Sequence, residues 1–209
     1  MPARHNQQMP ASTAEPRDAL RTLVAAITPT DVVEAEHREH VLAWIGSEAP
    51  LYRVRRPDVP PMHLVSYFVP VDPDSGEVLL VEHRNAGLLL PPGGHCEQGE
   101  LPWDTVVREF AEELHAPAFP HSTFGTAPAM VTVTRTRDRH GRGDQHVDVS
   151  LWHVLHVDRG QVTNFDAEEF TGIGWYAPAA VLRMPQADLD PHMHRFVTKF
   201  LARVQLPDL

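Results

Sequence analysis

The chain has a single cysteine among 209 residues, so it can form no disulfide within itself. No apolar run approaches the roughly 18 residues that a transmembrane helix needs. The first 18 residues also lack the apolar segment of a signal peptide. These absences predict a cytoplasmic protein that has no membrane partner.

Basic residues are also scarce. Lys and Arg total 18 against 28 Asp and Glu, which gives a net charge of −10 when the histidines are neutral. Excess negative charge opposes general binding to nucleic acids, so no nucleic-acid partner is expected. It still permits a small anionic substrate that a metal holds in a local site.

Composition shifts divide the chain into three parts. We expect a flexible tail over 1–18, a helical extension with a proline-marked linker over 19–60, and the main domain over 61–209. Thr30 has the residue type of an N-cap for the second helix of the extension. The apolar stripe of that helix is expected to comprise Val33, Val41, Leu42 and Ile45. The sequence leaves open whether the extension forms a homodimer surface, caps a pocket or packs on the main domain.

The main domain alternates strand-like and helix-like segments. Helices are predicted over 103–114 and 189–204. Strands are predicted at 63–71, 77–83, 88–90, 129–136, 146–156 and 172–176. This order predicts the α/β class, with a mixed sheet packed between helices.

One predicted helix carries three carboxylates on one face. Glu109, Glu112 and Glu113 stand at offsets of three and four residues. Such close like charges repel unless a cation lies among them, and Mg²⁺ prefers oxygen ligands. A solvated acidic face is the alternative explanation.

The flanking residues favour the metal site. Five residues separate Gly94 from Glu100, and seven separate Glu100 from Arg108. The segment continues as Arg108-Glu109-Phe110-Ala111-Glu112-Glu113-Leu114-His115-Ala116. This resembles the Nudix box, G-x5-E-x7-R-E-U-x-E-E-x-G-U, in which U is apolar. The departure is His115, where the family has glycine. Histidine enters the left-handed region more readily than most residues, so we expect a small cost in stability.

The resemblance implies a Nudix-like α/β/α sandwich with an N-terminal helical extension, and it implies residue roles. Glu109, Glu112 and Glu113 would bind Mg²⁺ or Mn²⁺ together with the carbonyl of Gly93. Glu100 and Arg108 would form an ion pair that orients these carboxylates.

Family members often have a further glutamate, which binds metal or acts as a base, in a loop before the last strand. Here that loop is acidic, and Glu169 matches the family position best, with Glu168 and Asp166 as alternatives. A solvated loop explains these charges equally well. The general base stays open between Glu169 and a glutamate of the box.

The function that the resemblance implies is pyrophosphohydrolysis of a nucleotide-type substrate. Water would attack phosphorus in a nucleoside diphosphate linked to another group. A non-hydrolytic protein of the same fold is the alternative, either an enzyme like isopentenyl diphosphate isomerase or a regulatory ligand-binding module. The stretches PPGGHCEQGE and HVDVSLW also resemble a broad group of actinobacterial-type Nudix proteins, which implies no single substrate.

Substrate contacts are expected near the predicted hairpin of the main domain. Arg135 and Arg137 lie closest to a strand end in a basic stretch, although an exposed hairpin tip explains that stretch as well. His146 and Asp148 share one face of a strand, either as a structural pair or as pocket lining. The 14 histidines show no paired zinc motif, and Cys96 is expected to be an ordinary free thiol.

Overall fold

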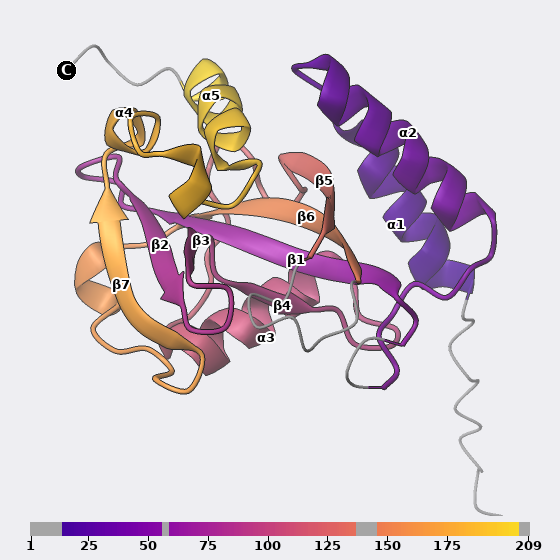
Figure 1. Ribbon diagram of the computed structural model, residues 1–209, viewed down its shortest axis with the longest axis horizontal. Coiled ribbons are helices and arrows are strands. Elements are labelled where there is room, and N and C mark those ends of the chain that lie inside the picture. Colours follow the sequence, from indigo (N-terminus) through magenta and orange to yellow (C-terminus); the bar gives the residue numbers. More distant parts are fainter. Residues whose placement is uncertain (1–13, 56–58, 137–145, 205–209) are drawn as a thin grey trace, which may run out of the picture.

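The computed structural model describes residues 14–55, 59–136 and 146–204. In these parts one mixed sheet of seven strands lies between helices (Figure 1). Helices α4 (Pro178–Val181) and α5 (Met193–Arg203) cover one face, and α3 (Pro102–Leu114) packs on the other. The α/β class and the sandwich architecture predicted from the sequence are confirmed.

Two long strands run parallel in the middle of the sheet, and their neighbours pair antiparallel. The strand order is β3-β2-β1-β6-β5, while β4 also pairs with β1 and β7 with β2. The strands are β1 (Met62–Val71), β2 (Val78–His83), β3 (Leu88–Leu90), β4 (Gly93–His95), β5 (Met130–Arg135), β6 (Val147–His156) and β7 (Phe170–Tyr176). All were expected except β4, whose Gly-Gly sequence has little strand propensity.

The register of β4 against β1 determines which way its side chains face. Gly94 pairs with Ser66, whose hydroxyl donates to the Pro102 carbonyl of α3 at 3.0 Å. Gly94 therefore lies on the α3 face. His95 pairs with Val65 and must face the opposite side, because successive residues of a strand alternate.

Packing at the two faces is mainly aromatic and aliphatic. On the α3 face, Phe110 meets Phe68 of β1 edge-on at 5.6 Å between ring centroids. On the other face, Phe196 of α5 stacks on Trp152 of β6 at 5.0 Å. These residues are fully buried, so both α3 and α5 are fixed to the sheet by apolar contact.

The C-terminal helix is shorter than expected. Instead of continuing back to 189, α5 begins at Met193 and follows a short 3₁₀ turn, Gln186–Asp188. Leu189 is extended and forms an isolated bridge with Leu89 of β3, so the helix cannot include it. A second 3₁₀ turn, Arg159–Gln161, follows β6.

The N-terminal extension consists of α1 (Ala14–Ala26) and α2 (Val32–Gly46), which pack against β5 and β6 at one side of the sheet (Figure 1). Residues 14–18 are thus helical and do not belong to the expected tail. Val41 and Ile45 are buried as expected. No helix in the described parts of the chain is long and apolar enough to cross a membrane.

Two expectations about α2 were wrong. Asp31, not Thr30, is the N-cap, and its carboxylate accepts from the Glu34 backbone N–H at 2.9 Å. Val33 is 39% exposed, while Glu34 is fully buried in an ion pair with Lys199 of α5. A charged pair replaces an apolar contact there because α5 supplies a cation, which the periodicity of α2 cannot reveal.

Candidate active site

Arg108 organises the carboxylates of α3. Its Nε and Nη2 donate to the two oxygens of Glu100 at 2.9 and 3.0 Å, and its Nη1 donates to Glu109 at 2.8 Å. Nη2 also donates to the His95 carbonyl at 3.1 Å. The Arg108 hydrogen bonds hold the pKa of Glu100 down at about 2, so this carboxylate is ionised. The arginine thereby joins the loop, the helix and β4.

Gly94 lets β4 approach α3 closely. A Cβ at this position would lie 1.9 Å from Oε1 of Glu109, far inside van der Waals contact. The glycine therefore leaves the space that the Glu109 side chain occupies. The backbone conformation of Gly94 does not itself require glycine, so glycine is needed here only because Glu109 fills the space beside it.

Glu113 is the most deeply placed carboxyl group of the set, with only 4% of the residue exposed. Burial, together with the nearby charges of Glu109 and Glu169, raises the pKa of Glu113 far above its usual range. The Gly93 N–H near the carboxylate lowers this pKa, but by less than burial and the two charges raise it. Glu113 Oε2 is buried and has no hydrogen-bond partner in the described parts of the chain. A buried acceptor without a partner is unfavourable unless a cation or proton satisfies it.

The acidic loop before β7 docks on the end of α3. The Asp166 N–H donates to the Glu113 carbonyl at 2.8 Å, and the Glu169 carbonyl accepts from the Arg84 N–H at 2.9 Å. These bonds bring the exposed Glu169 side chain to the Glu113 carboxyl group. Of the three acidic candidates in this loop, Glu168 is exposed and Asp166 caps its own turn by accepting from the Glu168 N–H at 2.7 Å.

The remaining carboxylate of α3 lies at the rim. Glu112 is 62% exposed at its side chain and reaches Arg108 Nη1 at 3.4 Å. The structure thus gathers Glu109, Glu113 and Glu169 at the centre, with Glu112 on the solvent side.

His115 ends α3 in the left-handed conformation, with φ 52° and ψ 32°. This is the conformation expected at the position where the family pattern has glycine. The substitution therefore leaves the helix end intact.

The family model described as NUDIX domain matches residues 62–200. This chain belongs to the NUDIX domain family. Membership assigns it to the Nudix-type hydrolases, which act on phosphoanhydride bonds. No match was found among curated proteins.

Solved structures agree with this fold. A MutT protein from Methanosarcina mazei Go1 superposes with a TM-score of 0.52 at 20% identity, over 67% of this chain and 93% of that one. An Ap4A hydrolase of C. elegans gives a TM-score of 0.50 at 18% identity, over 66% and 95%. At these identities the likeness concerns the Nudix fold.

The residues predicted to contact the substrate are Arg135, Arg137 and His146. Arg135 ends β5 as an exposed residue, and strand alternation puts it on the same face as Val131, toward α1 and α2. Arg137 lies outside the described residues. His146 precedes β6, where its Nε2 lies 3.2 Å from Asp148 Oδ1.

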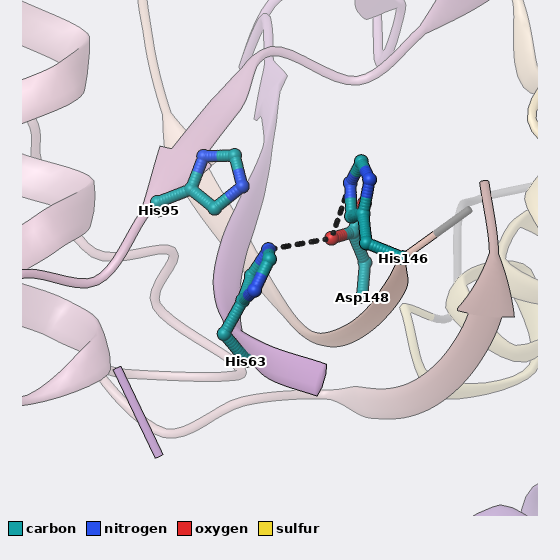
Figure 2. A group of neighbouring side chains, drawn as sticks. All are labelled: His63, His95, His146 and Asp148. Carbon is teal, nitrogen blue, oxygen red and sulfur yellow. Dashed lines mark ion pairs between the residues drawn. The ribbon is translucent and has the colours of Figure 1, made fainter. Parts of the chain in front are cut away.

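Sequence reasoning missed two neighbours of His146. His63 of β1 and His95 of β4 lie beside it, with ring centroids 5.2 and 6.4 Å from the His146 ring. The four side chains, Asp148 included, form one group (Figure 2). The only local signal was the His146-Val147-Asp148 spacing, because the other two members come from separate strands.

Cys96 follows β4 and is buried, with 1% of the residue exposed. Burial raises the pKa of its thiol to about 11. The thiol is therefore unreactive at neutral pH, which agrees with the expected ordinary free cysteine.

Proposed function

We propose that this protein is a metal-dependent pyrophosphohydrolase that cleaves a nucleoside diphosphate linked to another group. The observation that carries the proposal is the buried Glu113, which lies beside Glu109 and Glu169 and has an oxygen with no hydrogen-bond partner among the described residues. Like charges in a buried site are stable when a divalent cation lies among them.

The residues present fit Mg²⁺ or Mn²⁺. These hard cations take carboxylate oxygens and keep several waters, which suits a site that combines buried and exposed carboxylates. Glu109, Glu112 and Glu113 would hold the cation together with the Gly93 carbonyl, and Glu169 would add a further oxygen. When bound, the cation lowers the pKa of a bound water and neutralises charge on the phosphates.

The chain's own residues would then do three things. Arg108 and Glu100 hold Glu109 and the end of β4 in place through the hydrogen bonds described above. With the cation bound, Glu113 and Glu109 would supply ionised carboxylates at fixed positions on α3. Glu169, exposed to solvent next to them, accepts the proton from water as its oxygen bonds to phosphorus and the phosphoanhydride P–O bond breaks. The products are a nucleoside monophosphate and the phosphorylated leaving group.

A nucleotide-type substrate is supported by the fold neighbours, one of which is named an Ap4A hydrolase. Arg135, Arg137 and His146 stay predicted substrate contacts. The single cysteine favours a reducing compartment, so a cytoplasmic location is part of this proposal.

A hydrolysis screen tests the proposal. Nucleoside triphosphates, dinucleoside polyphosphates, nucleotide sugars and ADP-ribose would be incubated with Mg²⁺ or Mn²⁺, and cleavage measured for the wild type and for Glu113→Gln. A second pair of variants tests the proposed base. Glu169→Gln should lose kcat, while Glu168→Gln, at another exposed glutamate of the same loop, should not. An isomerase-like or purely binding protein would cleave none of these substrates.

A further inference from the structure

A group of four side chains lies on the face of β4 that points away from α3. His63, His95, His146 and Asp148 each offer one ligand atom, and these atoms all lie within 4.8 Å of one another. They come from β1, β4 and β6, which are adjacent in the sheet. The register explains the grouping: His63 pairs with Asp148, and His95 pairs with Val65, two residues along the same face.

The hydrogen bond on the far side of His63 fixes its tautomer. Its Nδ1 lies 2.8 Å from the Pro60 carbonyl, which can only accept, so Nδ1 carries the proton. In the neutral ring Nε2 is then a lone pair, and it points at Asp148 Oδ1 from 3.3 Å (Figure 2). When the ring is neutral, two acceptors thus face each other, and when it is protonated the contact is an ion pair.

His146 repeats this arrangement. The Thr136 hydroxyl donates to the His146 carbonyl at 3.2 Å, so its oxygen is available to accept from His146 Nδ1 at 2.9 Å. His146 Nε2 then presents its lone pair to the same Asp148 Oδ1, at 3.2 Å. Imidazole ligands of metals are held by such a hydrogen bond on the other ring nitrogen.

Three polar atoms of the group are buried and make no hydrogen bond with the described residues. His63 Nε2, His95 Nε2 and Asp148 Oδ1 have no hydrogen-bond partner in the part of the chain that the structure describes. His63 is fully buried, and Asp148 is 8% exposed. Leaving several buried polar atoms unpaired is costly, and one cation would satisfy them together.

We propose that His63, His95, His146 and Asp148 bind a transition-metal dication, Zn²⁺ by preference, at a second site distinct from the Nudix box. Three imidazoles and one carboxylate suit Zn²⁺ and exclude Mg²⁺, which avoids nitrogen ligands. In a tetrahedral zinc site with bonds of about 2.0–2.1 Å, neighbouring ligand atoms lie about 3.3 Å apart. The distances from Asp148 Oδ1 to Nε2 of His63 and His146, 3.3 and 3.2 Å, match this spacing of neighbouring ligand atoms.

Four protein ligands leave no open position, so the site is structural. It ties β4 to β1 and β6 through His95, whose carbonyl accepts from Arg108 at 3.1 Å. The metal therefore stabilises the strand on which the Nudix box begins. If His146 binds this metal, the predicted substrate contacts reduce to Arg135 and Arg137.

The test measures zinc in tag-free full-length protein by mass spectrometry, after dialysis against a weak chelator. The wild type should retain about one zinc per chain, as a closed four-ligand site does. His146→Ala and Asp148→Asn should each lose roughly 10- to 100-fold or more in zinc affinity. His156→Ala is the matched control, because His156 is an exposed histidine of the same strand, β6. Zinc should also raise the melting temperature of the wild type and not of Asp148→Asn.

Further arms separate this site from the box and from misfolding. Glu113→Gln should keep its zinc, since it alters only the box. Co²⁺ added to the wild type should give the intense visible absorption of tetrahedral coordination, a result that needs no variant to fold. The proposal is overturned if the wild type retains no zinc, if zinc affinity is unchanged in His146→Ala, if Glu113→Gln alone loses it, or if Co²⁺ gives a weak octahedral spectrum.

Discussion

Arg108 binds both carboxylate oxygens of Glu100, with Nε 2.9 Å from Oε1 and Nη2 3.0 Å from Oε2. This two-point contact fixes the guanidinium plane, from which Nη1 reaches Glu109. Neither residue needs to touch substrate for the contact to matter, because the contact positions Glu109, a proposed metal ligand.

Replacing Glu100 with Gln should therefore reduce kcat roughly 10- to 100-fold with little change in KM, as loss of an orienting partner does at metal sites. The amide offers Arg108 one acceptor and no charge. Glu97→Gln, an exposed glutamate in the same loop, is the control for steady-state kinetics. Equal kcat values for the two variants would show that the Glu100–Arg108 pair has no positioning role.

Gly94→Ala should weaken metal binding. The new Cβ would lie 1.9 Å from Glu109 Oε1, so the carboxylate must move. We expect the concentration of Mn²⁺ that gives half-maximal activity to rise roughly tenfold or more. At Gly46 an added Cβ would meet Arg21 Nη1 at an ordinary 3.7 Å, so Gly46→Ala is the control. An unchanged Mn²⁺ dependence in Gly94→Ala would exclude Glu109 as a ligand.

The N-terminal helices depend on a buried charge. Lys199→Met leaves Glu34 fully buried without its cation, which should cost about 3–5 kcal/mol of unfolding free energy. Combining it with Glu34→Leu should recover part of the loss. Arg195→Ala, which removes the more exposed ion pair to Asp31, should cost about 1 kcal/mol or less. Urea unfolding measures all three, and similar losses for Lys199→Met and Arg195→Ala would contradict the account.

Asp190 should make stability depend on pH. Burial raises its pKa to about 6, and the negative charge of Asp148 adds to the effect. The folded protein binds the Asp190 proton more tightly than the unfolded chain does, because folding raises the pKa from 3.8 to about 6. The contribution of Asp190 to the free energy of unfolding is therefore fully present below pH 3.8 and is lost as the pH rises through 6. Between these two pH values the ionisation of Asp190 should lower the free energy of unfolding by about 2–3 kcal/mol.

Asp190→Asn tests this titration, because the amide oxygen can still accept from the His192 N–H, which lies 2.7 Å from Asp190 Oδ1. In chelator, the variant should be more stable than the wild type at pH 7 and about equal at pH 4. A constant difference between these pH values would mean that Asp190 does not titrate there.

The catalytic side of the molecule was largely predictable because its information is local. Glu109 and Glu113 lie one helical turn apart, so helical periodicity places them together. The pairing of Glu100 with Arg108 was implied by the resemblance to the Nudix box. What spacing could not show is depth. Glu112 differs from Glu113 by one position, yet only Glu113 is buried against the sheet.

The histidine group was not predictable for the opposite reason. His63 and His95 are 32 positions apart and His146 lies 51 further on, so only the strand register joins them. The burial of Glu34 in place of Val33 was unpredictable for the same reason, because the ion-pair partner of Glu34 is Lys199 on the last helix. Long-range pairing decides such positions, and local pattern does not record it.

The central claim is that the box carboxylates bind a divalent cation for phosphoanhydride hydrolysis. The most direct measurement is hydrolysis of the nucleotide substrate found in the screen, followed during a Mn²⁺ titration of wild-type protein and of Glu113→Gln. The account predicts saturable, Mn²⁺-dependent cleavage by the wild type and a loss of roughly 100-fold or more in the variant. Cleavage that is independent of the metal, or equal in the two proteins, would contradict it.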